Sequence, residues 1–103
     1  MAVENIKDDQ FESAVAGEKV IVKFYADWCG SCKLFAPKYK RLSNDDRFSD
    51  VSFIEVNAEE NPNARKHAGV DNLPFFATYS KGQLQSGSAG SKEEMVVSML
   101  EKL

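Results

Sequence analysis

Two cysteines, Cys29 and Cys32, are the residues of this 103-residue chain whose type and spacing best suit chemistry. A disulfide between them would close a loop too short to constrain the unfolded chain much, so a purely stabilising crosslink explains the pair poorly. Inside a cell, three interpretations remain for two thiols at this spacing: redox chemistry, metal ligation, or two incidental cysteines.

The residues on either side of the cysteines indicate how they would react. An apolar run ends at Tyr25, and a helical pattern follows from Ser31. Cys29 then stands where unpaired backbone N–H groups and the helix dipole favour a thiolate, which makes it the nucleophile. Cys32 lies one turn into the helix, on the same face and further from water, and suits the thiol that resolves a mixed disulfide.

Two neighbours of Cys29 suit substrate binding. Gly30 allows a partner's backbone to approach closely, and Trp28 offers a flat apolar surface that can exclude water and cover a bound peptide. Taken alone, Trp28 could equally be a core residue. Asp27 and Lys33 are interpreted as a solvated rim that can bias the charge of partners.

The elements that must position these residues follow from composition and periodicity. β-Branched and aromatic runs predict strands at 20–25, 51–56 and 75–79, and a turn at Lys81-Gly82 returns the chain into a hairpin strand at 83–86. Four helices are predicted: one capped by Asp8 or Asp9, one at 31–47 bent at Pro37, one from Asn61-Pro62 to Gly69, and a terminal one opened by a capping box at Ser91 and Glu94. The Ser86 to Ser91 run of small residues is expected to be a loop.

This order of elements predicts an α/β fold with a central mixed sheet flanked by helices, in which parallel pairing comes first and the hairpin last. The length and the absence of a linker favour one domain over 1–103. With 43% hydrophobic residues the chain can bury a core, which excludes low-hydrophobicity disorder.

The net charge and the first residues of the chain limit the classes of binding partner and the cellular location that we expect for the protein. Lys and Arg number 13 against 16 Asp and Glu, a net charge of −3, which argues against nucleic acid as a partner. No apolar run approaches the ~20 residues of a membrane span, so no membrane association is expected. The first residues lack the pattern of a signal peptide, and a reducing, cytoplasmic location is expected.

The segment from Val22 to Lys33, with Trp-Cys-Gly-Ser-Cys-Lys at its end, closely resembles the active-site segment of thioredoxins. Asn61-Pro62, Leu73-Pro74, Lys81-Gly82 and the terminal helix occupy corresponding places, so the resemblance covers essentially the whole chain. It implies a thioredoxin-like fold and a dithiol that reduces protein disulfides without a bound cofactor. It also implies recharging by an NADPH-dependent, flavin-containing thioredoxin reductase.

The same resemblance implies a role for the Leu73-Pro74 segment. Pro74 is expected to follow a cis bond and to face the cysteines. Leu73 is then expected to pair its backbone with an extended substrate segment, as in strand addition.

Ser31 is one departure from the thioredoxin pattern, which usually has Pro at this place. The change adds a backbone N–H and a hydroxyl near the Cys29 sulfur. Both should stabilise the thiolate and raise the reduction potential above the thioredoxin value of about −270 mV, toward about −180 mV for disulfide isomerase. Alternatively, Ser31 caps the helix with little redox effect.

Lys23 and Glu55 form the second departure. Thioredoxins typically have a buried Asp at the place of Lys23, with a Lys across from it on the next strand, so the signs are swapped here. The two side chains are expected either to form a buried ion pair or to extend separately to solvent. In the first case Glu55 or a partly desolvated Lys23 would accept the proton of Cys32.

Two other functions stay open beside protein-disulfide reduction. Ser31 favours an isomerase-like or more oxidising role, and the groove around Trp28, Leu73 and Pro74 could serve a binding module without turnover. No metal site is expected, because a four-ligand zinc site would have to recruit His67, which is interpreted as a surface residue, and a carboxylate. A metal cluster shared by two copies through the cysteines is left open, as is the oligomeric state.

Overall fold

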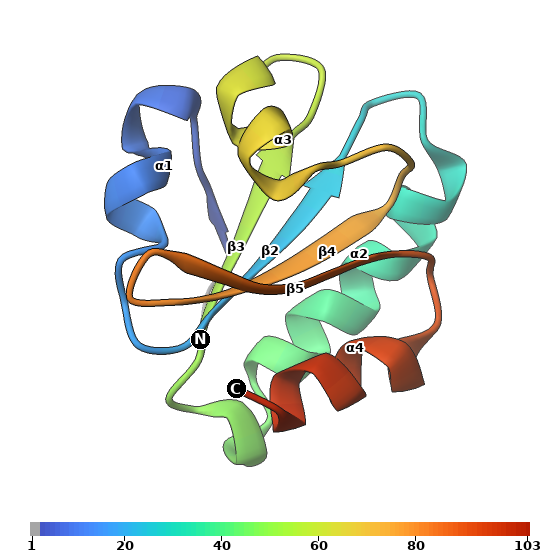
Figure 1. Ribbon diagram of the computed structural model, residues 1–103. Coiled ribbons are helices and arrows are strands. Elements are labelled where there is room, and N and C mark those ends of the chain that lie inside the picture. The colour runs from blue at the N-terminus through green and yellow to red at the C-terminus, as the bar shows by residue number, and fades with distance from the viewer. Residues whose placement is uncertain (1–2) are drawn as a thin grey trace.

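Apart from a short first strand, the backbone elements follow one another in the order that the apolar patterns predict. A computed structural model describes residues 3–103 and contains a five-stranded sheet flanked by helices (Figure 1). The strands are β1 (Glu4–Asn5), β2 (Val20–Tyr25), β3 (Ser52–Asn57), β4 (Phe75–Ser80) and β5 (Gln83–Ala89). The helices are α1 (Asp8–Ala14), α2 (Gly30–Ser43), α3 (Pro62–Ala68) and α4 (Glu93–Glu101), with a 3-10 turn at Asp46–Phe48.

The sheet is mixed, as expected, with the strand order β1-β3-β2-β4-β5. Strands β1, β3 and β2 are parallel, whereas β4 is antiparallel to β2, and β5 forms a hairpin with β4. The β2–β3 register sets Lys23 directly beside Glu55. This register places both charges on one face of the sheet, because side chains opposite one another in a ladder point the same way.

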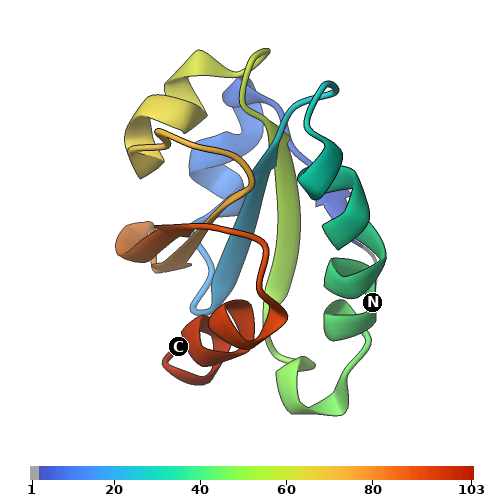
Figure 2. The same cartoon turned by 90° about the vertical axis from the view of Figure 1, so that its right-hand side faces the viewer.

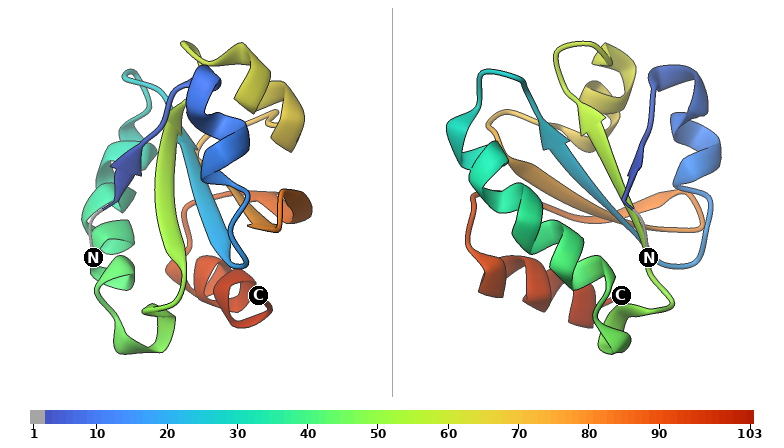
Figure 3. Two further views of the ribbon diagram at one scale, coloured as in Figure 1. Left: turned by 90° about the vertical axis from the view of Figure 1, so that its left-hand side faces the viewer. Right: turned by 180° about the vertical axis from the view of Figure 1, so that it is seen from behind.

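Alternation along β2 separates two core layers. Val20, Val22 and Phe24 belong to a cluster with the apolar residues of α1 and α3, whereas Ile21 belongs to a cluster with those of α2 and α4. The helices accordingly cover opposite faces of the sheet (Figures 2 and 3). Lys23 points the same way as Ile21, so this lysine is enclosed beneath α2.

The active-site segment begins where β2 ends. Tyr25 closes the strand, a short turn follows, and α2 starts at Gly30 with Cys29 as its N-cap. The helix then continues through Pro37 and is anchored by buried Phe35 and Tyr39. None of the helices within residues 3–103 has the length and apolar character needed to cross a bilayer.

The structure departs from the expected elements, most clearly at the first strand and in the segment before the last helix. The helix expected at 31–47 also ends earlier, at Ser43. A short strand, β1, precedes α1 and was not predicted, because a two-residue strand carries no periodic signal. The capping box at Ser91 is not formed: Lys92 is the N-cap of α4 and no side chain caps it. Most of the loop expected from Ser86 to Ser91 is part of β5, which extends to Ala89, and only Gly90 and Ser91 lie outside it.

The small residues of β5 leave room for the aromatic side chains of β4, as Gly87 shows. A Cβ atom at Gly87 would lie 2.9 Å from a ring carbon of Phe75, closer than packed carbon atoms approach. Phe75 is itself buried and packs edge-on against Phe24 with ring centroids 6.3 Å apart. The small side chains therefore permit close approach in the hairpin.

Helices α1 and α3 cap one another across the chain. Asp8 is not the N-cap of α1, which is Lys7. Its carboxylate accepts the N–H groups of Asn63 at 3.1 Å and Ala64 at 2.9 Å, at the start of α3. Asn61, the N-cap of α3, in turn accepts the Asp8 N–H through Oδ1 at 2.8 Å. The acidic residue predicted to cap the first helix thus satisfies the unpaired donors of a different one.

Candidate active site

Cys29 and Cys32 form a disulfide at the first turn of α2, with Cα atoms 5.3 Å apart. The Cys29 sulfur is the N-cap acceptor: it takes the Cys32 backbone N–H at 3.2 Å, and the Ser31 hydroxyl oxygen lies 3.6 Å from it. A sulfur in this position faces the positive end of the helix and unpaired donors, which is the environment that stabilises a thiolate.

Burial does not separate the two cysteines in the disulfide form. Cys29 is 4% exposed and Cys32 is 3% exposed, so the expectation that Cys32 lies clearly further from water is not supported here. Their surroundings differ instead. Cys32 lines a pocket that is partly open to solvent, and Cys29 carries the helix-capping contacts.

The other predicted binding residues are neighbours of Cys29 in sequence or belong to the Leu73-Pro74 segment, of which Leu73 contacts the cysteine cluster. Trp28 is 67% exposed, so it is a surface residue and not core packing. Leu73 packs against the cluster that contains both cysteines. The Leu73-Pro74 bond is cis, as the resemblance implies, and Pro74 is buried. Gly30 and Ser31 are exposed at the start of α2, which leaves this edge of the disulfide open to a partner chain.

Lys23 and Glu55 form the ion pair that the swapped signs suggested. Nζ of Lys23 lies 3.6 Å from Oε1 of Glu55. The lysine side chain is 4% exposed and that of Glu55 is 29% exposed, so Lys23 does not extend to solvent. The alternative of two separate side chains in water is therefore wrong for Lys23, whereas Glu55 retains contact with water.

The electrostatics of this pair reflect its burial. Burial lowers the pKa of Lys23, and the charge and hydrogen bond of Glu55 oppose that shift. The ammonium group also lies 5.2 Å from the centroid of the Tyr39 ring, within cation–π range. The Tyr39 hydroxyl donates to the carbonyls of Ile21 and Ile54, and burial raises its pKa well above the usual value.

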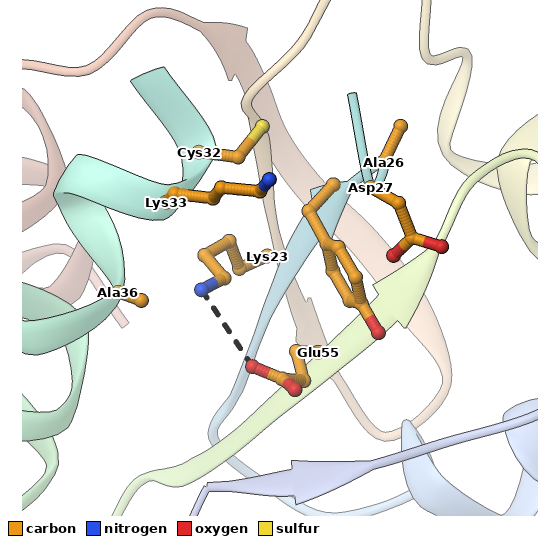
Figure 4. A pocket seen from close by; sticks show the side chains of 8 residues that line it. Lys23, Ala26, Asp27, Cys32, Lys33, Ala36 and Glu55 are labelled. Carbon is orange, nitrogen blue, oxygen red and sulfur yellow. Dashed lines mark ion pairs between the residues drawn. The ribbon is translucent and has the colours of Figure 1, made fainter. Parts of the chain in front are cut away.

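A cavity of about 210 Å³ connects Cys32 with this pair. Figure 4 shows Cys32 and Lys33 on α2 above Lys23, with Glu55 on the neighbouring strand. The cavity is lined by eight residues: Lys23, Tyr25, Ala26, Asp27, Cys32, Lys33, Ala36 and Glu55. The cavity can hold water, because one side is charged and its volume exceeds that of several water molecules. The pocket therefore leaves room for water between Cys32 and the ion pair.

Two residues at the site were not predicted. Glu59 accepts the indole N–H of Trp28 at 2.7 Å. Asn5 of β1 donates its amide to the Tyr25 hydroxyl at 2.7 Å and to Oε2 of Glu55 at 3.2 Å. Both residues come from segments distant in sequence from their partners, so no local pattern could have revealed them.

His67 lies apart from this site. It is exposed, as expected, and its Nδ1 atom lies 2.8 Å from the Tyr79 hydroxyl. Burial raises the pKa of Tyr79 to about 12. Within residues 3–103, no group of three or more His, Cys, Asp or Glu side chains could hold a metal ion.

A Cys-x-x-Cys disulfide that caps a helix beside an exposed aromatic residue is the arrangement of a thiol–disulfide oxidoreductase. Here it lies on a mixed sheet covered by two helices on each face. The fold and the site together define the class of this protein as a dithiol–disulfide oxidoreductase with a thioredoxin-like fold.

Comparisons with known proteins specify the family. The thioredoxin family model matches residues 2–102. The chain is 38% identical to thioredoxin of Gallus gallus over 96 residues, which cover 91% of this chain and 90% of the relative. It is 39% identical to thioredoxin-1 of Schizosaccharomyces pombe over 83 residues, 79% of each chain. The chain therefore belongs to the thioredoxin family.

Solved structures agree with this assignment. The crystal structure of thioredoxin from Malassezia sympodialis superposes with a TM-score of 0.91 at 25% identity, covering 98% of this chain and 90% of that one. The family membership and the Cys29–Cys32 disulfide make the chain a protein-disulfide oxidoreductase. Its relatives also include a mitochondrial and a chloroplastic thioredoxin.

Proposed function

We propose that the chain is a protein-disulfide reductase in which Cys29 is the nucleophile and Cys32 is the resolving thiol. The observation that carries these roles is the capping geometry: the Cys29 sulfur accepts the Cys32 N–H at 3.2 Å at the positive end of α2. Hydrogen bonding to the thiolate favours that form, and the thiolate is the species that attacks a disulfide.

The reaction transfers two electrons from the dithiol to the substrate. The Cys29 thiolate attacks one sulfur of the substrate disulfide, which forms a mixed disulfide and releases one substrate thiolate. The Cys32 thiolate then attacks the Cys29 sulfur, which forms the Cys29–Cys32 disulfide and releases the second substrate thiolate. Each released substrate thiolate takes up one proton. These two protons balance the one that Cys29 loses to solvent when it ionises and the one that Cys32 loses before its attack.

The Glu55 carboxylate, or Lys23 in its neutral form, is proposed to receive the proton that Cys32 loses before its attack. The pair shares a cavity with Cys32, and Glu55 reaches solvent where the proton can leave. Replacing Lys23 with Met removes the cation and should change the pH profile of mixed-disulfide resolution, measured by stopped flow from pre-reduced protein. A profile that coincides with that of the unmodified chain would remove Lys23 from the mechanism.

Trp28, Gly30, Ser31, Leu73 and Pro74 are proposed to form the surface that binds the substrate segment. Their support is the contact of Leu73 with the cysteine cluster, the place of the first three residues beside Cys29 in the chain, and the exposure of Trp28. Cys32→Ser should trap substrates as mixed disulfides on Cys29, identified by mass spectrometry after reduction. Cys29→Ser/Cys32→Ser is the matched control. A Cys32→Ser protein that captures no more than this control would favour a non-catalytic binding module.

The electron donor is proposed to be an NADPH-dependent thioredoxin reductase, and the location to be the cytoplasm. The support is the family membership and the absence of any cysteine besides the pair, which leaves no structural disulfide. NADPH oxidation by a thioredoxin reductase should depend on the concentration of the oxidised chain. Faster reduction by glutathione and a glutathione reductase would contradict the assigned donor, and recovery from an organelle fraction would contradict the location.

An isomerase-like or more oxidising role is the second candidate, and the Ser31 hydroxyl 3.6 Å from the Cys29 sulfur favours it. This contact would stabilise the thiolate and hence the dithiol. Titration in glutathione buffers, followed by Trp28 fluorescence, gives the potential of the couple. A value near about −270 mV supports the general reductase, and one near about −180 mV supports the isomerase-like role.

A further inference from the structure

The segment between β5 and α4 borders the proposed substrate surface and packs on a methionine. The Gly90 N–H donates to the Pro74 carbonyl at 2.9 Å, so Gly90 is joined to the Leu73-Pro74 segment. A Cβ atom at Gly90 would lie 3.6 Å from Sδ and 3.7 Å from Cε of Met95, so the end of this side chain packs against Gly90. Met95 therefore links the first turns of α4 to the backbone that holds Pro74.

The sulfur atom of Met95 is both reachable and hydrogen-bonded. Met95 is partly exposed, whereas Met99, one turn further along α4, is buried with 8% of its surface exposed. A dissolved oxidant must reach the sulfur, so Met95 is the more readily oxidised of the two methionines within residues 3–103. The Ser88 hydroxyl on β5 donates to Sδ of Met95 at 3.2 Å. This hydroxyl can also donate to the oxygen of a sulfoxide, which gives the oxidised side chain a partner.

We propose that Met95 is a site of oxidation by hydroperoxides, and that its sulfoxide slows the reduction of protein disulfides. The sulfur attacks the terminal oxygen of the hydroperoxide, and the O–O bond breaks. The thioether is oxidised by two electrons to the sulfoxide, and the hydroperoxide is reduced to an alcohol, or to water in the case of hydrogen peroxide. The proton of the attacked oxygen moves to the leaving oxygen, so atoms and electrons balance.

The contacts of Met95 connect its oxidation to the substrate surface. A hydroxyl 3.2 Å from the sulfur leaves no space for an oxygen atom between them, and Gly90 packs against the same sulfur. The sulfoxide must displace one of these neighbours or turn outward, and it replaces an apolar contact by a polar group. Each of these movements shifts the support of Gly90, whose N–H holds the Pro74 carbonyl. This effect, unlike the oxidation itself, rests on the proposed role of Leu73 and Pro74 in substrate binding.

The first test locates the oxidation by peptide mass spectrometry. Hydrogen peroxide is added to the chain in its disulfide form, in which Cys29 and Cys32 have no free thiol. The sulfoxide should form at Met95 at least about threefold faster than at Met99, because the buried sulfur is shielded. Oxidation of Met99 as fast as Met95, or no sulfoxide at Met95, would overturn the site.

The second test measures single turnovers after the peroxide is removed and the cysteines are reduced with dithiothreitol, which leaves sulfoxides intact. The oxidised chain should reduce insulin about 3- to 10-fold more slowly, the range that one hydrogen-bonded contact supports. The rate with a small aromatic disulfide, which does not pair with Leu73, should stay within about twofold. Methionine sulfoxide reductases should restore the rate with insulin.

Variants at the two methionines show whether the effect passes through Met95. Met95→Leu removes the sulfur and keeps an apolar side chain, so peroxide should not slow it. Met99→Leu is the matched control on the same helix, and peroxide should slow it as much as the unmodified chain. Met95→Gln places a polar group near Gly90 and should reproduce the slow reduction of insulin without any oxidant.

The outcomes separate this inference from the proposed function. If Met95 is oxidised and the rate with insulin is unchanged, or if peroxide slows Met95→Leu equally, the role of Met95 fails and the reductase function is unaffected. An equal loss with insulin and with the small disulfide would also overturn the role, because it would indicate general damage. A chain that does not reduce insulin before treatment would overturn the proposed function and with it the effect on substrates, whereas the mass spectrum would still decide whether Met95 is the oxidation site.

Discussion

Replacing Glu55 with Gln removes the partner of a buried cation and keeps the size of the side chain. Two unit charges separated by the observed 3.6 Å interact by about 4–5 kcal/mol at an effective dielectric constant of about 20. Glu55 is 29% exposed, so water screens part of this interaction, and the amide oxygen of Gln still accepts a hydrogen bond. We therefore expect Glu55→Gln to lower the free energy of unfolding by about 2–3 kcal/mol at neutral pH, below the 3–5 kcal/mol of a fully buried pair.

The pH dependence of this loss identifies its cause. Burial lowers the pKa of Lys23, and Glu55 counteracts that effect, so the pKa should fall further in Glu55→Gln. The unfolded chain then binds more protons than the folded one between the lowered pKa and the ordinary value of about 10.4. The loss of stability relative to the unmodified chain should therefore be complete below the Lys23 pKa of Glu55→Gln. It should shrink as the pH rises from there to the Lys23 pKa of the unmodified chain, which is itself lowered.

Urea unfolding from pH 6 to pH 10, followed by circular dichroism, measures both quantities. Glu60→Gln is the matched control for an exposed glutamate, and we expect it to change stability by less than about 0.5 kcal/mol. Lys23→Met/Glu55→Gln should lie within about 1 kcal/mol of the unmodified chain, because a neutral pair leaves no buried charge. The reasoning is refuted if Glu55→Gln loses no more than the control, or if the double variant is as unstable as the single one.

Three further changes test other parts of the structure. Asp8→Ala should lower the free energy of unfolding by about 2 kcal/mol, because it removes the acceptor of two α3 N–H groups. Asp9→Ala, on the same turn, should lower it by less than about 0.5 kcal/mol. Equal losses of the two variants in thermal unfolding would contradict the capping role of Asp8. Gly87→Ala should cost about 1–3 kcal/mol, because its Cβ meets the Phe75 ring, and an unchanged urea midpoint would show that the hairpin adapts freely. Ser31→Pro removes a hydroxyl and an N–H near the nucleophile and should shift the potential toward about −270 mV; no shift in glutathione buffers would mean that Ser31 has only a capping role.

The Lys23–Glu55 pair shows how far local patterns extend. The two charged residues could be recognised in apolar strands, and their opposite signs suggested a pair. Whether Lys23 would reach water depended on α2, whose Tyr39 and Ala36 enclose the lysine from above. That enclosure arises from packing between segments distant in sequence, so the sequence left both alternatives open.

The contacts of Asp8 and Glu59 show more clearly what local sequence patterns cannot predict. Asp8 has the composition and place of a cap for its own helix, yet it caps α3, 55 residues further on. Glu59 reads as one more exposed charge in a loop, yet it binds an indole 31 residues away. A carboxylate can accept hydrogen bonds from several kinds of donor. Its actual partner depends on which helix ends and side chains the fold brings next to it.

The sequence by itself determined the chemistry and the order of the elements. The two cysteines, their spacing and the strand before them are local properties, as are the apolar periods that specify each strand and helix. Tertiary structure decided what surrounds the sulfur atoms: the burial of Lys23, the support of Trp28, the addition of β1 and the extension of β5. These features depend on register and on contacts between remote segments, whose energies no local pattern contains.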